Sequence, residues 1–179
     1  MKTAIGIDAS TSSTGVVLLR GQKDAAVPEL VLETLVKAPA KLTGIERYKA
    51  ITIELMEMLE AHKPDRIVIE GYSLNMKNAS SVVPLVELGG LIRFMMHLDG
   101  YKWLDPRATE LKKFVTGKGN APKEVMMMHV LKRWGHEAKN NDTADAYGLA
   151  CMGLLHVGAL GNSTQGQREI IGAAPLKCN

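Results

Sequence analysis

Four acidic side chains occupy positions where an unpaired carboxylate would be unfavourable, and they are the first clue to function. Asp8 and Glu70 each end a short apolar run, in the sequences IGID and IVIE. Asp142 and Asp145 are three residues apart, a spacing that places both on one face of a helix near its start. Burying a charge without a partner costs several kcal/mol. These carboxylates therefore require cations, hydrogen-bond donors or protons.

The chemistry that suits such a set is metal-dependent hydrolysis. Carboxylates without a cluster of Cys or His favour Mg²⁺ or Mn²⁺ over zinc, and without a cation at least one of four neighbouring carboxylates would bind a proton. Two ions about 3.5–4 Å apart activate a water and stabilise the leaving oxygen of a phosphodiester. We therefore expect two Mg²⁺ (or Mn²⁺) ions and hydrolysis of nucleic acid. Taken singly, each acid is better explained as a turn residue or a helix cap, so the hypothesis rests on the set.

Charge is unevenly distributed along the chain. Residues 102–139 hold nine Lys or Arg against four Asp or Glu, whereas the whole chain has a net charge of +3. A basic segment on an otherwise mildly acidic protein fits a nucleic-acid surface, although a solvated helix face would have the same composition. The two cysteines form no disulfide framework, and no signal peptide or membrane-spanning run is present. We expect a soluble cytoplasmic protein with no membrane partner.

The elements that must position the acids alternate between strands and helices. Apolar runs predict strands over 3–8, 14–20, 29–36, 66–70 and 101–104. Spacings of three and four residues predict helices over 44–62, 84–98, 106–115, 123–134 and 143–157. A strand that follows a helical crossover is expected to lie parallel to an earlier strand. If that neighbour is the first strand, Glu70 and Asp8 emerge at the same edge of the sheet. The pattern predicts an α/β fold with a mixed five-stranded sheet flanked by helices.

We expect residues 1–158 to form one domain. Residues 159–179 are rich in Gly, Ser and Gln, contain little material for a core, and are predicted to be a C-terminal tail. Residues 72–81 are predicted to be a polar loop, and Pro106 is expected at the first position of its helix. Several ring side chains are expected to serve packing or the surface rather than chemistry: His129, His136, Trp103 and Trp134.

Several of these blocks resemble the RuvC family of Holliday junction resolvases, in the family's order and at similar spacing over residues 3–157. The blocks are IGID with Thr14-Gly15, the strand IVIE, the stretch KKFVTGKGNAPK and the closing DTADA. The resemblance implies a ribonuclease H-like fold and a homodimer that cuts two strands of a four-way DNA junction symmetrically, using Mg²⁺ or Mn²⁺. It further implies that the metal ligands are Asp8, Glu70, Asp142 and Asp145.

The resemblance also implies that two lysines, Lys112 and Lys123, help to hold or neutralise the scissile phosphate. Together with the basic segment, this gives a set of expected DNA contacts: Tyr72, Lys112, Lys113, Lys118 and Lys123. A two-fold dimer makes physical sense for such an enzyme, because one site per subunit, related by a two-fold axis, would nick a nearly symmetric junction at matched positions.

The chain departs from the family pattern in two places. The family usually has Asp-Pro-Gly where this chain has Asp8-Ala9-Ser10, and it has an aromatic wedge where this chain has Ser73. Tyr72 or Leu74 is the candidate replacement for a side chain that inserts against unstacked bases. Such departures are typical of phage-encoded relatives that accept other branched DNA, including three-way junctions and forks. The sequence leaves open the need for a branch-migration motor and whether the cell is bacterial or a phage-infected host.

Three other functions fit part of the pattern. A related ribonuclease H-like nuclease could act on RNA/DNA hybrids or forks. The sequence GID followed by Thr14-Gly15 also resembles the phosphate loop of actin-like and sugar kinases, although those proteins need two such domains and are longer than 179 residues. A metal-free protein that binds branched DNA without cutting it would share the basic segment.

Overall fold

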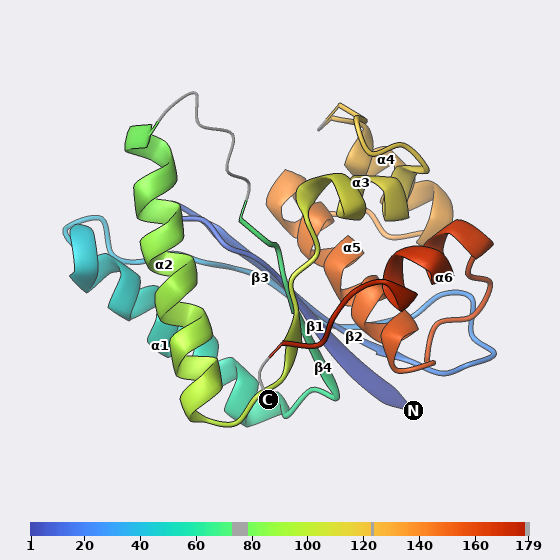
Figure 1. The fold of residues 1–179 in the computed structure, drawn as a ribbon, viewed down its shortest axis with the longest axis horizontal. Helices are drawn as coiled ribbons and strands as arrows, with labels where there is room; N and C mark the ends of the chain where they lie inside the picture. Colours follow the sequence, from blue (N-terminus) through green and yellow to red (C-terminus); the bar gives the residue numbers. More distant parts are fainter. Residues whose placement is uncertain (73–78, 123, 178–179) are drawn as a thin grey trace.

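A mixed five-stranded sheet separates two layers of helices in the computed structural model, which describes residues 1–72, 79–122 and 124–177 (Figure 1). The strands are β1 (Lys2–Asp8), β2 (Thr14–Gly21), β3 (Glu29–Val36), β4 (Arg66–Ile69) and β5 (Trp103–Leu104). The helices are α1 (Gly44–His62), α2 (Ala79–Leu98), α3 (Ala108–Thr116), α4 (Val125–Trp134), α5 (Asn141–His156) and α6 (Gln165–Gly172). The predicted fold class is confirmed.

The order of strands across the sheet is β3-β2-β1-β4-β5. The first three strands form an antiparallel meander, and β4 returns through α1 to lie parallel to β1, with Ala4 opposite Arg66 and Ile7 opposite Ile69. The expected parallel neighbour of β1 is therefore confirmed. As a result, the carboxyl ends of β1 and β4 lie at the same edge of the sheet.

Alternation along the strands divides the core in two. On one face, Ile5 and Ile7 pack with Ile67 and with the buried sides of α1 and α2. On the other face, Ala4 and Val68 pack with α5, behind which lie α3, α4 and α6. Figure 1 shows α1 and α2 on one side of the sheet and α3 to α6 on the other. Successive side chains of a strand point to opposite faces, so both layers follow from the sequence.

Helix α5 lies unusually close to the strands because glycines line its contact. A Cβ atom built on Gly6 would lie 2.0 Å from the carbonyl oxygen of Ala146 in α5. A Cβ on Gly15 would lie 2.3 Å from the carbonyl oxygen of Asp142. Both contacts are with the backbone, so a larger residue cannot be accommodated by rotating a side chain. These glycines fix the distance between α5 and strands β1 and β2.

Two predicted boundaries on the path to the site are wrong. Helix α2 begins at Ala79, inside the predicted loop 72–81. The prediction missed this start because the first turn of the helix shows no apolar periodicity. Residues 73–78 of that loop lie outside the described residues. Pro106 is not the first residue of α3. The Pro106 carbonyl accepts a hydrogen bond from the Gly71 N–H at 2.8 Å. The helix begins at Ala108, after the N-cap Arg107, whose backbone N–H donates to the Glu110 carboxylate.

The C-terminal segment contains core material, contrary to the prediction for residues 159–179. Helix α6 packs on α3 and α5, with Ile171 buried and the Gln167 side chain donating to the Phe114 carbonyl at 3.0 Å. The Lys177 N–H donates to the Trp103 carbonyl at 2.8 Å. A helix of eight residues with few apolar positions gives a weak periodic signal, which is why the sequence did not indicate it. None of the helices in the described part of the chain has the length and apolarity required to cross a membrane.

Candidate active site

Asp8 and Glu70 lie side by side at one edge of the sheet. Asp8 is the last residue of β1, and the Glu70 N–H donates to the Ile7 carbonyl at 3.1 Å, which continues the parallel pairing by one residue. Both acids are half-buried and line one pocket of about 90 Å³. The expected meeting of these two remote acids is confirmed. Their role in catalysis stays a prediction.

The turn after Asp8 is closed by a buried hydroxyl. Thr14 donates its hydroxyl hydrogen to the Ser10 carbonyl at 2.8 Å, and the same oxygen accepts the Ser10 N–H at 3.1 Å. Thr14 is fully buried at the start of β2. This reciprocal pair closes the Ser/Thr-rich turn without the Pro-Gly that the family usually has there. The departure therefore changes the turn sequence while Asp8 keeps its place at the strand end.

Helix α5 brings the other two acids to the same strands. Asp142 is in the first turn of α5, and its Cβ would lie 3.2 Å from a Cβ on Gly15, the residue paired with Asp8 across the β1–β2 ladder. Asp145 follows three residues later, and both side chains are half-buried. The partial positive charge at a helix N-terminus favours carboxylates in this first turn.

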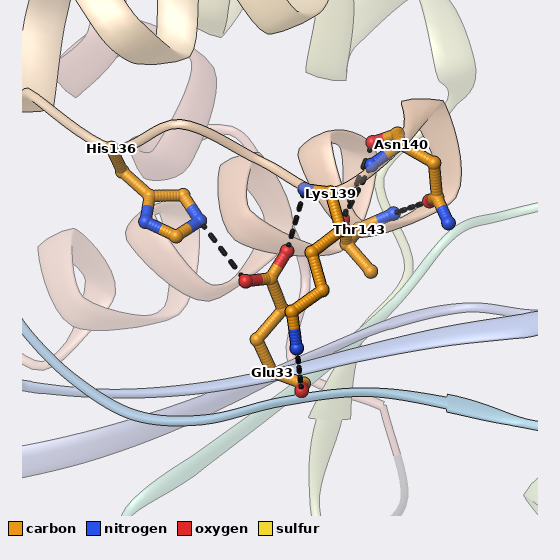
Figure 2. Close-up of polar contacts among 5 residues, drawn as sticks. All are labelled: Glu33, His136, Lys139, Asn140 and Thr143. Carbon is orange, nitrogen blue, oxygen red and sulfur yellow. Dashed lines mark hydrogen bonds and ion pairs between the residues drawn. The ribbon is translucent and has the colours of Figure 1, made fainter.

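The start of α5 is fixed by a capping box. The Asn140 side chain accepts the Thr143 N–H at 2.9 Å, while the Thr143 hydroxyl accepts the Asn140 N–H at 3.3 Å (Figure 2). The predicted cap at residues 140–142 is confirmed with Asn140 as the N-cap. The cap holds Asp142 at a defined position relative to the end of the strands.

Asp8, Glu70 and Asp142 lie at one end of the sheet, but the described acids do not form a closed metal centre. Among the described residues, no group of three or more His, Cys, Asp or Glu side chains is arranged to hold a metal ion. The described lining of the pocket at Asp8 and Glu70 does not include Asp142 or Asp145. The donor set still suits a hard divalent cation, because it consists of half-buried carboxylates from three neighbouring elements.

Arg93, which was not predicted as a site residue, connects α2 to this site. Its guanidinium donates to the Glu70 carbonyl at 2.9 Å and to the Gly89 carbonyl at 3.1 Å. Its central carbon lies 4.4 Å from the centre of the Tyr72 ring, a cation–π contact. Arg93 also lines the same pocket as Asp8. The one available signal was an arginine within an otherwise apolar stretch of α2.

Tyr72 lies at the mouth of this pocket. It is 40% exposed, and its hydroxyl donates to the Val86 carbonyl at 3.5 Å. A Cβ on Gly89 would lie 2.8 Å from the Tyr72 ring, so the ring lies directly against α2. The other candidate wedge, Leu74, and Ser73 lie outside the described residues. Tyr72 as a DNA contact stays a prediction.

Comparison with known proteins identifies the family to which this chain belongs. Residues 4–153 match the family model for the crossover junction endodeoxyribonuclease RuvC. This chain belongs to the RuvC family. Among curated relatives, RuvC of Carboxydothermus hydrogenoformans is 30% identical over 158 residues, which are 87% of this chain and 98% of that protein. RuvC of Chlorobium phaeobacteroides is also 30% identical over 158 residues, which are 86% of this chain and 82% of that protein.

Solved structures agree on the fold. Thermus thermophilus RuvC superposes with a TM-score of 0.72 at 18% identity, covering 98% of this chain and 99% of that one. The same protein in complex with Holliday junction substrate gives a TM-score of 0.71 at 19% identity, covering 99% of this chain and 100% of that one. These structures share the ribonuclease H-like fold. Membership of the RuvC family disfavours the actin-like, sugar-kinase and metal-free alternatives.

Three of the four lysines predicted to contact DNA lie in α3 or in the connection that follows it. Lys112 is half-buried in α3, and Lys113 is exposed on the same helix. Lys118 is exposed in the connection to α4, where it lines a second pocket of about 460 Å³ with Thr116 and His129, among others. Lys123 lies outside the described residues. The predicted phosphate contacts of all four lysines stay predictions.

Proposed function

We propose that this RuvC-family chain is a structure-selective endodeoxyribonuclease that resolves four-way DNA junctions and also cuts other branched DNA. The observation that supports this most directly is the shared sheet edge, where Asp8 and Glu70 line one pocket and α5 presents Asp142 against the paired strand. The RuvC relative from Thermus thermophilus, solved in complex with Holliday junction substrate, supports the choice of substrate.

We further propose two Mg²⁺ or Mn²⁺ ions per site, held by Asp8, Glu70, Asp142 and Asp145. Such ions would polarise the scissile phosphate and lower the pKa of a bound water. The chain itself contributes the alignment: β1 and β4 hold their acids at one edge, and the cap of α5 holds the other two. Half-burial of the carboxylates limits their hydration, so bulk water competes less with a metal ion for the carboxylate oxygens.

The basic segment 102–139 is proposed as the DNA surface. Exposed Lys113 and Lys118, half-buried Lys112, and Lys123 would contact phosphates, and Tyr72 would stack on a base at the junction. Phosphate contacts position DNA without reading its sequence. This division of roles suits an enzyme that selects branched structure.

A homodimer is proposed because two matched nicks require two sites related by a two-fold axis. Helix α2 provides support: it exposes large apolar side chains at helical spacing, among them Val83, Val86, Phe94 and Leu98. Clustered exposed apolar residues on one helix are typical of an interface. A second copy of the chain is the occupant that the proposed chemistry requires. We propose that the dimer acts on DNA in the cytoplasm, with residues 1–158 as the nuclease domain and helix α6 packed against its α3 and α5.

The test is a cleavage assay that offers four-way, three-way, forked and linear DNA side by side, with and without Mg²⁺. We expect paired nicks in the four-way junction, weaker cutting of the other branched forms, and none of linear DNA. Asp8→Asn should lower the rate by more than about 100-fold, because it removes a direct metal ligand. Its junction affinity should remain, because the lysines are unchanged.

Two results would contradict the proposal. Loss of junction binding together with cleavage in Asp8→Asn would make Asp8 a structural residue. Cleavage of an RNA/DNA hybrid in preference to every branched DNA would favour the ribonuclease H-like alternative.

A further inference from the structure

The segment that leads into α5 is bound to the edge strand β3 by Glu33, a residue whose side chain is buried. Glu33 Oε1 accepts the backbone N–H of Lys139 at 3.0 Å, and the Lys139 ammonium donates to the Glu33 carbonyl at 3.2 Å (Figure 2). Glu33 Oε2 lies 3.5 Å from His136 Nε2, an ion pair when the imidazole is protonated. The two contacts with Lys139 join residues 106 positions apart in the sequence.

Glu33 differs from an ordinary acid on an edge strand. Its side chain is 5% exposed, and that of His136 is 14% exposed. On the same strand, Glu29 is 59% exposed and pairs with Arg20, as is typical of a solvated surface pair that contributes little to stability. A buried carboxylate is retained only where donors compensate for lost hydration. The Glu33 contacts are therefore a specific arrangement rather than a solvated strand face.

The contacts of Glu33 act on the residues at which α5 begins. Lys139, which Glu33 holds, directly precedes the N-cap Asn140, and the capping box then fixes the turn that contains Asp142. A second contact reaches the next turn, because the His136 ring stacks on Tyr147 of α5 with centroids 4.5 Å apart and planes 9° apart. The start of α5 is thus held by the hydrogen bond from Lys139 to Glu33 of β3 and by the stacking of His136 on Tyr147 in the second turn of the helix.

We propose that Glu33 is a positioning residue for the RuvC-type site: its hydrogen bond to the Lys139 N–H sets where α5 begins and so aligns Asp142 and Asp145 with the acids of β1 and β4. This inference rests on the proposed function, because it assigns Glu33 to the alignment of that site. A glutamate that only stabilised the fold would affect folding without changing how the aligned acids bind metal.

The experiment compares Glu33→Ala with Glu33→Gln, which retains an oxygen acceptor for the Lys139 N–H, and uses Glu29→Ala as the matched control. For Glu33→Ala we expect the maximal rate at saturating four-way junction to fall about 10- to 100-fold and the Mn²⁺ concentration for half-maximal rate to rise by a similar factor. Junction affinity should change less than about threefold, because no phosphate contact is removed. Glu33→Gln and Glu29→Ala should stay within about threefold of the wild type.

A second measurement does not depend on activity. In the metal-free protein, amide hydrogen exchange over residues 139–145 should accelerate in Glu33→Ala and remain near the wild-type rate in Glu33→Gln. The reason is that only the Ala variant removes the acceptor for the Lys139 N–H at the start of α5. If Glu33→Ala does not fold, Glu33→Asp, whose carboxylate is one methylene shorter, should show the same shifts to a smaller degree.

The outcomes separate the inference from the proposed function. Failure of the wild-type protein to cut any branched DNA would overturn the proposed function itself. A wild type that cuts, with Glu33→Ala showing unchanged rate and metal dependence, would overturn the role of Glu33. Lower thermal stability with unchanged metal dependence, or a Gln variant as impaired as the Ala variant, would equally contradict positioning through this hydrogen bond.

Discussion

The two faces of the sheet are packed by different means. On the α5 face, the helix backbone lies directly on glycines of β1 and β2, so that a Cβ on Gly6 or Gly15 would collide with carbonyl oxygens. On the opposite face, α1 and α2 pack through side chains such as Leu55 and Leu88, which share one hydrophobic cluster with Ile7. Side chains can repack, whereas a backbone contact allows one distance. The face that supplies two of the four acids is therefore the rigid one.

The largest expected effect comes from filling the α5 contact. A methyl group at Gly6 would lie 2.0 Å from the Ala146 carbonyl oxygen and 2.5 Å from the Ala150 nitrogen, so Gly6→Ala must push α5 off the sheet. We expect it to lower the free energy of unfolding by about 3 kcal/mol and to abolish cleavage. Urea unfolding and the junction assay measure the two effects.

The comparison substitution in the opposite layer is Gly90→Ala, at an exposed position of α2. A Cβ there would have the Tyr72 hydroxyl at 3.8 Å as its nearest neighbour, which is ordinary contact. Replacing glycine by alanine in a helix should raise the free energy of unfolding by about 0.5–1 kcal/mol. Equal destabilisation by Gly6→Ala and Gly90→Ala would refute the contrast between the faces.

Arg93 tests the difference between the two faces further, because its hydrogen bond to the Glu70 carbonyl connects α2 to the site. Arg93→Ala removes the hydrogen bonds to the Glu70 and Gly89 carbonyls and the contact with the Tyr72 ring. We expect the single-turnover cleavage rate to fall about 10-fold and the free energy of unfolding to fall by about 1–2 kcal/mol. Arg20→Ala, which breaks an exposed pair with Glu29, is the control and should leave the rate unchanged.

A loss of stability in Arg93→Ala without any change in rate would show that Glu70 needs no support from α2. The α2 face would then contribute only to the core and the proposed dimer.

The smallest expected effect is at the opposite end of β4. Partial burial disfavours the charged form of Asp65, but hydrogen bonds from Lys2 and Thr3 outweigh it, so the pKa of Asp65 lies below its ordinary value. A lowered pKa in the folded state contributes stability above the unfolded pKa of about 3.9, and this stability is lost as pH falls through the folded value. Asp65→Asn should cost less than about 1 kcal/mol at pH 7, with the difference shrinking near pH 3.

Urea unfolding of the wild type and Asp65→Asn at both pH values measures this difference. A difference that is the same at pH 7 and near pH 3 would mean that the carboxylate charge plays no part at this position.

The acids on the strands could be predicted because their signals are local. An apolar run that ends in Asp8 or Glu70 is visible in a few letters, and the crossover through α1 then places β4 parallel to β1. The cap at Asn140 was equally local. What these patterns could not give is the geometry of the four carboxylates relative to one another, which depends on how closely α5 approaches Gly15.

The supporting residues could not be predicted because their partners are remote. Glu33 reads as one more acid on a strand, yet it binds a backbone group 106 residues away. Arg93 reads as an isolated charge in a helix, yet it binds the Glu70 carbonyl 23 residues earlier. Helix α6 was missed for another reason: its packing relies on the buried Gln167, which contributes nothing to an apolar pattern.

The most direct test of the account is calorimetric titration of the protein with Mn²⁺ in the absence of DNA, comparing the wild type with Asp8→Asn from β1 and Asp142→Asn from α5. If the acids of the strands and of α5 share one site, the wild type should bind two ions per chain, and each substitution should weaken or remove binding. Wild-type Mn²⁺ binding in Asp142→Asn alongside its loss in Asp8→Asn would contradict a site shared between the strands and α5.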